Sequence, residues 1–217
     1  MTGAKPAKKT FKSYPVGYFH IDIAEVHTEE GRLYLLVVID RKSKFVFAQL
    51  HEKATLRVAG DFLCVLIGAM PYRVHTVLTD NGNHFTTPGN TSSAVPLIKE
   101  AILRGEIFRA HSFELACAQN DIDHRLTQPR YPWTNGQVAR MNRTLKDATV
   151  QRYYYDSHDE LQGPLGDFLT AYNFARRLQT LRGLTPYEYI CKIWTAEPER
   201  FGLDTLHQMP RLLYPAA

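Results

Sequence analysis

The chain has 217 residues, of which 44% are hydrophobic and 12% aromatic, so it is long and apolar enough to bury a core. No run reaches the roughly 18 apolar residues that a membrane helix needs, and the N-terminus lacks the apolar centre of a signal peptide. Lysine and arginine outnumber aspartate and glutamate by 26 to 22, and this net charge of +4 permits nucleic-acid binding without requiring it. We therefore expect a soluble intracellular protein with no membrane partner.

The cysteines and histidines argue against two kinds of small scaffold. Cys64, Cys117 and Cys191 are odd in number and widely separated, so they indicate neither a disulfide framework nor a four-cysteine zinc site. None of the nine histidines pairs with a second histidine and a cysteine pair at zinc-finger spacing. We interpret the cysteines as reduced thiols that lie in the core.

The N-terminal half of the sequence predicts a meander followed by a helix. Residues 1–15 are basic, contain glycine and proline, and lack periodicity, which is typical of a linker or tail. Three short apolar segments, residues 18–26, 33–39 and 45–50, are separated by polar turns, as in three antiparallel strands. Residues 55–70 then carry apolar side chains at helical spacing.

The middle of the sequence predicts a buried strand at residues 74–78, because the run is continuously apolar rather than alternating. Interrupted helical structure is expected over residues 95–120, and a fifth strand over 122–126. Val138, Met141 and Leu145 recur at the spacing of a helix packed on a core.

The remaining sequence is predicted to be helical. Two N-terminal capping patterns mark helix starts within it, namely Ser157 with Glu160 and Thr185 with Glu188. In the second pattern, Pro186 takes the first helical position, where proline is favoured.

Two aspartates occupy unusual positions. Asp22 lies within the otherwise apolar first strand, where a carboxylate needs a cation, hydrogen-bond donors or a raised pKa. Asp80 follows the predicted central strand, where α/β sheets commonly place a ligand crevice. Taken singly, a structural salt bridge for Asp22 and ordinary turn chemistry for Asp80 explain them equally well. In a sheet ordered 3-2-1-4-5, however, both carboxylates face one point, and paired hard oxygen donors suit Mg²⁺ or Mn²⁺.

Several motifs together carry a specific family resemblance. The sequence is similar to integrase-core transposases of bacterial insertion sequences, which share the retroviral-integrase catalytic core and an Asp, Asp, Glu triad. The similarity covers residues 16–190. Its motifs are His20-Ile21-Asp22, Leu78-Thr79-Asp80-Asn81-Gly82, the segment Pro132 to Arg143, Ala171-Tyr172-Asn173 and Leu184-Thr185-Pro186-Tyr187-Glu188.

The resemblance implies an RNase H-like α/β fold, a five-stranded mixed sheet flanked by helices. It implies a basic linker over residues 1–15, an integrase-like catalytic core over 16–155 and a helical C-terminal extension over 156–217. It further implies metal-dependent cleavage and joining of DNA strands, with Asp22 and Asp80 holding two Mg²⁺ or Mn²⁺ ions. The expected partners are transposon-end and target double-stranded DNA and further copies of the chain, in the bacterial cytoplasm with the nucleoid.

One position departs from the family pattern. The third carboxylate belongs directly after Gly136-Gln137-Val138, and this chain has Ala139 there. Asp147 lies about 12 Å further along the predicted helix, too far to reach the same ion. Glu25 should point to the other face of its strand, because it is an odd number of residues from Asp22. We therefore predict an intact fold with severely impaired DNA cleavage.

The expected DNA contacts lie near this site. Positions 139, 142, 143 and 146 share one helix face, which either meets phosphates or is simply solvated. Trp133 either stacks on a base or anchors its loop. The candidate contact residues are Asn81, His84, Trp133, Arg140, Asn142, Arg143 and Lys146, together with the basic loop Arg41, Lys42 and Lys44.

Two other functions are compatible with all of these motifs. A non-enzymatic DNA-binding or assembly subunit descended from a transposase would not need Asp22 and Asp80 individually. A nuclease of the same fold would cut DNA without joining it.

Overall fold

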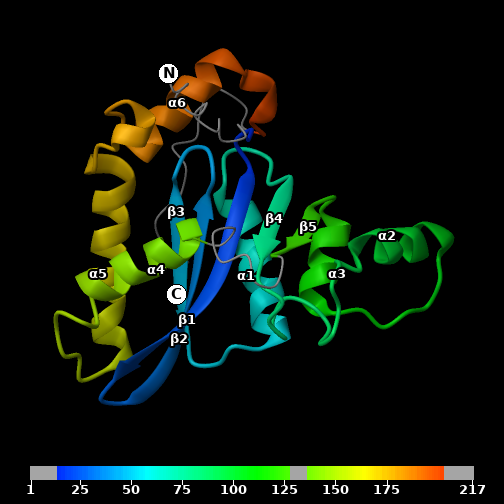
Figure 1. The fold of residues 1–217 in the computed structure, drawn as a ribbon, viewed down its shortest axis with the longest axis horizontal. Helices are drawn as coiled ribbons and strands as arrows, with labels where there is room; N and C mark the ends of the chain where they lie inside the picture. Colours follow the sequence, from blue (N-terminus) through cyan, green and yellow to red (C-terminus); the bar gives the residue numbers. More distant parts are fainter. Residues whose placement is uncertain (1–13, 128–135, 203–217) are drawn as a thin grey trace, which may run out of the picture.

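The chain folds around a five-stranded mixed sheet with helices on both faces (Figure 1). The computed structural model describes residues 14–127 and 136–202. The strand order is β3-β2-β1-β4-β5, which confirms the order predicted from the sequence. The strands are β1 (Tyr18–Thr28), β2 (Gly31–Asp40), β3 (Val46–His51), β4 (Thr76–Thr79) and β5 (Asp123–Leu126).

Helices surround this sheet. Within the described ranges, the α-helices are α1 (Leu56–Ala69), α2 (Val95–Arg104), α3 (Ser112–Gln119), α4 (Gly136–Ala148), α5 (His158–Thr170) and α6 (Pro186–Ala196). A π-helical turn, η2 (Ala171–Ala175), follows α5, and two 3₁₀ turns are η3 (Gln179–Leu181) and η4 (Pro198–Arg200). None of the helices in the described part of the chain is both long and apolar enough to cross a membrane.

Strand register fixes which residues stand level across the sheet. β1, β2 and β3 form an antiparallel meander, with Ile23 opposite Leu36. β4 joins β1 in parallel, with His20 opposite Leu78, and β5 joins β4 in parallel. Two residues beyond the His20–Leu78 pair, β1 and the segment after β4 therefore present Asp22 and Asp80 at the same level.

One face of the sheet packs on α1 and α3. Alternate β1 residues, Phe19 and Ile21, point to this face and are fully buried. They meet α1 through Phe62 and α3 through Phe113. The predicted helical stretch 95–120 is divided because Gly105, in the left-handed conformation, ends α2. Figure 1 shows α2 projecting away from the sheet at one edge.

The opposite face packs on α4 and α5. β2 contributes Leu35 and Val37, and α4 contributes Val138, Met141 and Leu145, the apolar residues whose spacing predicted this helix. Even-numbered β1 residues, including Asp22, point to the α4 side because Phe19 and Ile21 occupy the other face.

The C-terminal segments begin with the predicted caps. Ser157 Oγ accepts a hydrogen bond from the Glu160 amide, and Thr185 with Glu188 forms a complete capping box. Asn173, in the π-helical turn, is buried and its side chain both accepts from Val46 N at 2.9 Å and donates to Val46 O at 2.8 Å. These two hydrogen bonds fix η2 to the edge strand β3.

Candidate active site

Asp22 is a half-buried carboxylate held by two hydrogen bonds. Its Oδ1 accepts from the Ile23 amide at 3.0 Å, and its Oδ2 accepts from Asn142 Nδ2 at 2.7 Å. Burial, followed by the charge of Asp80, raises the pKa of Asp22 to about 6, while both hydrogen bonds and Lys146 act in the opposite direction. The electrostatic coupling agrees with the register of β1 and β4, which brings the two aspartates together.

Asp80 follows β4 in a tight turn. Its Oδ1 accepts from the Gly82 amide at 2.9 Å. A Cβ at position 82 would lie 2.8 Å from the same oxygen, so any other residue there would push the Asp80 carboxylate out of this position. The motif Asp80-Asn81-Gly82 therefore forms a turn, which was one interpretation of the sequence. The turn also places the Asp80 carboxylate close enough to Asp22 to act on it electrostatically.

A buried polar network supports the end of β4. Thr79 Oγ1 donates to Asp80 O at 2.9 Å and lies 2.9 Å from His124 Nε2 on β5. His124 Nδ1 lies 3.2 Å from Ser93 Oγ and 3.6 Å from Glu114 Oε1. The Glu114 side chain also accepts from the Ala94 amide at 2.8 Å. The network ties β4, which Asp80 directly follows, to α3 and to the start of α2.

The polar atoms around the two aspartates fit a divalent cation. Within the described residues, neither carboxylate has a salt bridge to lysine or arginine. The side-chain oxygens of Asn81 and Asn142 are buried and lack a hydrogen-bond partner there. Two carboxylates and two amide oxygens are hard donors of the kind that Mg²⁺ and Mn²⁺ take. No third histidine, cysteine or acid joins them in the described part of the chain.

Comparison with known proteins decides the family. Residues 13–132, which are 120 of the 217, match the family described as Integrase core domain, and residues 120–186 match a second family of the same description. The chain belongs to the integrase core domain family.

Two curated relatives match this chain over a small part of much longer chains. A Gag-Pol polyprotein of avian reticuloendotheliosis virus is 26% identical over 210 residues, 94% of this chain and 16% of the relative. Protein K02A2.6 of Caenorhabditis elegans, which is uncharacterized, is 26% identical over 181 residues, 82% of this chain and 12% of the relative. The chain thus spans less than a fifth of the length of either.

Two solved structures share the fold. The integrase catalytic core domain of HTLV-2, solved with magnesium in a trimeric form, superposes with a TM-score of 0.57 at 18% identity, covering 81% of this chain and 96% of the other. A chain of the simian T-cell lymphotropic virus intasome, in complex with a PP2A regulatory subunit, gives a TM-score of 0.58 at 22% identity, covering 76% and 50%.

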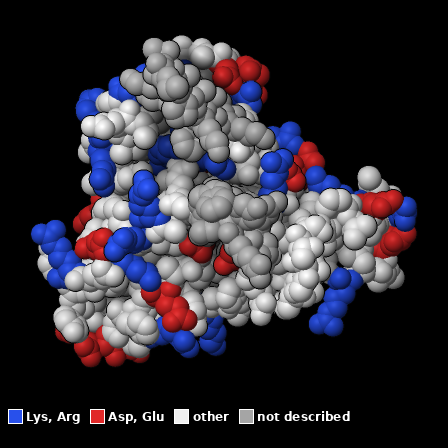
Figure 2. All heavy atoms as spheres, in the orientation of Figure 1, with Lys and Arg blue, Asp and Glu red and all other residues white. Residues whose placement is uncertain are grey.

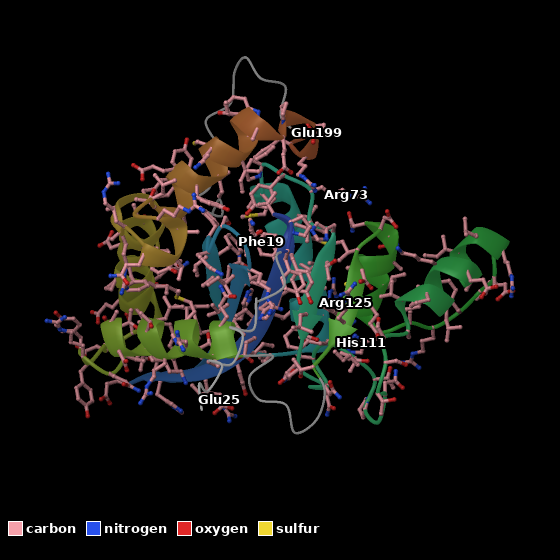
Figure 3. The ribbon with its side chains drawn as sticks, turned by 45° about the horizontal axis from the view of Figure 1, so that its top comes forward. Phe19, Glu25, Arg73, His111, Arg125 and Glu199 are labelled. Atoms are coloured by element: carbon pink, nitrogen blue, oxygen red, sulfur yellow. The ribbon has the colours of Figure 1, made fainter. Side chains whose placement is uncertain are left out.

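Ala139 lies on α4 of this integrase core, one turn before Asn142. Residues three apart share a helix face, so position 139 is on the side of α4 whose next turn touches Asp22. Ala139 is exposed. Glu25 is engaged elsewhere, because it pairs with Arg32 at 3.4 Å near the outer end of β1 (Figure 3). Asp147 is exposed near the far end of the same helix.

The candidate DNA contacts on α4 differ in their exposure to solvent and in their distance from Asp22. Asn142 is only 7% exposed and is occupied by its bond to Asp22, while Lys146 is close enough to act on that carboxylate electrostatically. Arg143 is exposed to solvent. Arg140 lines a pocket together with Lys44, which lies in the turn between β2 and β3. Figure 2 shows acidic atoms at the centre of this face with basic side chains around them.

The other candidates take separate positions. Asn81 and His84 lie in the segment after β4, and both are half-buried. Trp133 lies outside the described residues. Arg41 and Lys42 belong to the β2–β3 turn, where Asp40 accepts hydrogen bonds from the backbone amides of Lys42 and Ser43, each at 2.7 Å.

The sequence analysis named His20 only as part of a motif and did not place it among the site residues. His20 stands two residues before Asp22 on the same strand face and is 1% exposed; Arg41 Nη1 donates to its Nε2 at 3.3 Å. Burial, then Arg41 and Lys44, lower the pKa of His20 to about 3. The even spacing of positions 20 and 22 was the signal available for His20.

Replacing Asp22 with asparagine should stabilise the fold at alkaline pH. The folded-state pKa lies above the ordinary 3.8, so ionisation disfavours folding, and stability falls as pH rises from about 4 to about 6. We expect Asp22→Asn to raise the free energy of unfolding at pH 8 by roughly 1–3 kcal/mol. Urea denaturation with chelator present measures this. The exposed control Asp61→Asn should stay within about 0.5 kcal/mol of the parent. If Asp22→Asn and the parent had the same unfolding free energy at every pH, the charge of the buried Asp22 carboxylate would not destabilise the fold.

Removing the Glu114 carboxylate should weaken the fold. In Glu114→Ala, the Ala94 amide and the His124 ring lose a buried partner, and we expect a loss of roughly 3 kcal/mol in unfolding free energy. Chemical denaturation measures it, with the exposed Glu29→Ala as control. A loss no larger than that of the control would show that the network does not support β4.

Proposed function

We propose that this chain is the catalytic core of a transposase or integrase that cleaves DNA strands and joins transposon ends to target DNA. The observation that carries the proposal is the coupled pair Asp22 and Asp80, in an integrase core, at the level where β1 and β4 run side by side. The negative charge of the pair has no lysine or arginine partner among the described residues, and this favours cation binding because partly buried carboxylates without a counter-charge are unfavourable.

The chain's own residues would each have a role in phosphoryl transfer. Asp22 and Asp80 would hold Mg²⁺ or Mn²⁺, which when bound activate a water or a 3′-hydroxyl and stabilise the leaving oxygen. Asn142 keeps the Asp22 carboxylate in one orientation through its 2.7 Å bond. The His124 network holds Asp80 by fixing Thr79. The magnesium named for the HTLV-2 integrase core is consistent with this choice of metal.

Ala139 makes this copy catalytically impaired, in our proposal. An anionic ligand at position 139 would share the face of α4 that meets Asp22, and alanine supplies no donor atom. Loss of one carboxylate leaves the cations more weakly held and the reactive phosphate less neutralised. The fold tolerates the residue, since alanine is the best helix former.

Double-stranded DNA and further copies of the chain are the proposed partners. Arg143 and Lys146 extend the basic side of α4 next to the carboxylates and suit phosphate contacts, which position DNA without reading its sequence. Joining two ends requires them to be held together, and the related structures are an intasome and a trimeric form. We propose a dimer or larger assembly.

The alanine at position 139 also favours a second candidate function. A DNA-binding or assembly subunit that has lost catalysis would retain the integrase fold while tolerating Ala139. In such a protein Asp22 and Asp80 would be individually dispensable, so the two proposals differ in what restoration of the carboxylate achieves.

Restoring the carboxylate should restore the reaction. We expect Ala139→Glu to cleave and join a labelled DNA end with Mg²⁺ or Mn²⁺, at least about 100-fold faster than the parent. Its melting temperature should also rise more with added Mn²⁺, because a tighter site stabilises the folded state. Ala139→Gln is the matched control, since it has the same length without the charge and should stay inactive.

The possible outcomes separate the candidates. Equal activity in parent and Ala139→Glu would place the third ligand elsewhere. If neither protein cleaves or joins DNA but both still bind it, the chain is better explained as a DNA-binding or assembly subunit. Cleavage without joined products would indicate a nuclease.

A further inference from the structure

Half of the large apolar residues that are exposed in the described part of the chain lie in one short stretch, namely α2 and the residues just after it. Leu97 is 70% exposed, Leu103 is 87% exposed and Ile107 is fully exposed, while Ile102 and Phe108 are exposed to a smaller extent. Single exposed leucines are common on protein surfaces, but a group of this size on one element marks an interaction site.

Helix α2 has two apolar faces, and its own chain covers only one of them. Val95 and Ile98 are buried in the core shared with α1 and α3. Leu97, Glu100 and Leu103 follow one another at three-residue steps on the outward side, because residues three and four apart share a helix face. The outward side therefore has an apolar character that the fold of a single copy does not use.

The outward face is held in a fixed orientation, although α2 projects from the edge of the sheet (Figure 1). The helix start is tied to the buried network, because the Ala94 amide donates to Glu114 at 2.8 Å. Further along, Lys99 Nζ donates to Asp121 Oδ1 at 2.6 Å, just before β5. A surface fixed in advance loses little conformational entropy when a partner binds.

The charges on this face are complementary to those of a second copy. Arg104 pairs with Glu100 in the same helix and lies 3.6 Å from Glu106. Two antiparallel copies of α2, related by a two-fold axis beside position 102, would place Glu100 of each copy opposite Arg104 of the other. The same symmetry places Leu97 opposite Ile107, since a two-fold contact pairs each residue reciprocally.

The exposed area suits a contact between two copies. The five apolar residues leave on the order of 600 Å² exposed, the upper end of what a typical monomer shows in its largest apolar patch. A stable interface buries about 800 Å² on each partner, so this patch and its charged rim supply most of the area required.

We infer that a second copy of this chain binds the outward face of α2 in a two-fold, antiparallel arrangement. The inference rests on the proposed function, because holding two DNA ends together requires more than one copy, and it names the surface through which the copies meet. The apolar residues form the centre of the contact, and Glu100 and Arg104 of the two copies form opposite-charge pairs across it.

Sedimentation equilibrium of the full chain, in chelator and without DNA, tests the inference. Leu103→Glu/Ile107→Glu adds two charges at exposed positions, so the fold should be retained, which circular dichroism checks. We expect the parent to form dimers and this variant to associate at least about tenfold more weakly. Tyr154→Glu replaces an exposed apolar residue elsewhere and should associate like the parent. A parent that stays monomeric at roughly 100 µM, or equal association of parent and α2 variant, would overturn the inference.

A mixing experiment tests the two-fold arrangement. Glu100→Arg alone and Arg104→Glu alone should each associate about tenfold more weakly than the parent, because each variant places like charges opposite one another. An equimolar mixture of the two variants should recover association, since each such contact in the mixed dimer joins opposite charges. The pair within the helix is lost in both variants and cannot cause the recovery. A mixture that associates no better than either variant alone would overturn the arrangement.

The same data keep the two proposals separate. Dimers that depend on α2, together with an inactive Ala139→Glu protein, would contradict the proposed catalysis alone. An active Ala139→Glu protein whose association does not change with Leu103→Glu/Ile107→Glu would contradict the α2 contact alone.

Discussion

The burial of two carboxylates side by side, Asp22 on β1 and Asp80 after β4, is the constraint on which the rest of this structure depends. Burial disfavours ionisation of Asp22 most strongly and the neighbouring charge of Asp80 adds to that effect, so the pKa of Asp22 is raised. A fold selected only for stability would avoid this arrangement. Its presence where β1 and β4 run side by side is the physical argument for the cation-binding site that we propose.

The surrounding elements serve this pair in distinct ways. The parallel register of β1 and β4 sets the two aspartates level, and the glycine turn after Asp80 leaves room for its carboxylate. α4 supplies Asn142 to orient Asp22. The buried network that ties β4 to α3 also fixes the start of α2, because Glu114 accepts from the Ala94 amide. One network therefore links the strand before Asp80 to the surface on which we place the second copy.

Much of the fold could be predicted because its signals are local. The alternation in the meander, the continuous apolar run of β4 and the spacing of Val138, Met141 and Leu145 correspond to observed elements. The buried network of Glu114 and His124 could not be predicted, since its members are distant in sequence and meet only through the β4–β5 pairing. The outward apolar face of α2 could not be predicted either, because apolar residues at helical spacing are expected to face the core.

Asp22 and Asp80 form one electrostatically coupled carboxylate pair in this structure. Carbon-detected NMR titration of the Asp22 carboxyl, in chelator, tests this most directly when the parent is compared with Asp80→Asn. We expect the pKa of Asp22 to be about 6 in the parent, to be lower in Asp80→Asn, and to fall in the parent on addition of Mg²⁺. Titration of Asp22 at its ordinary value in both proteins, with no response to Mg²⁺, would contradict it.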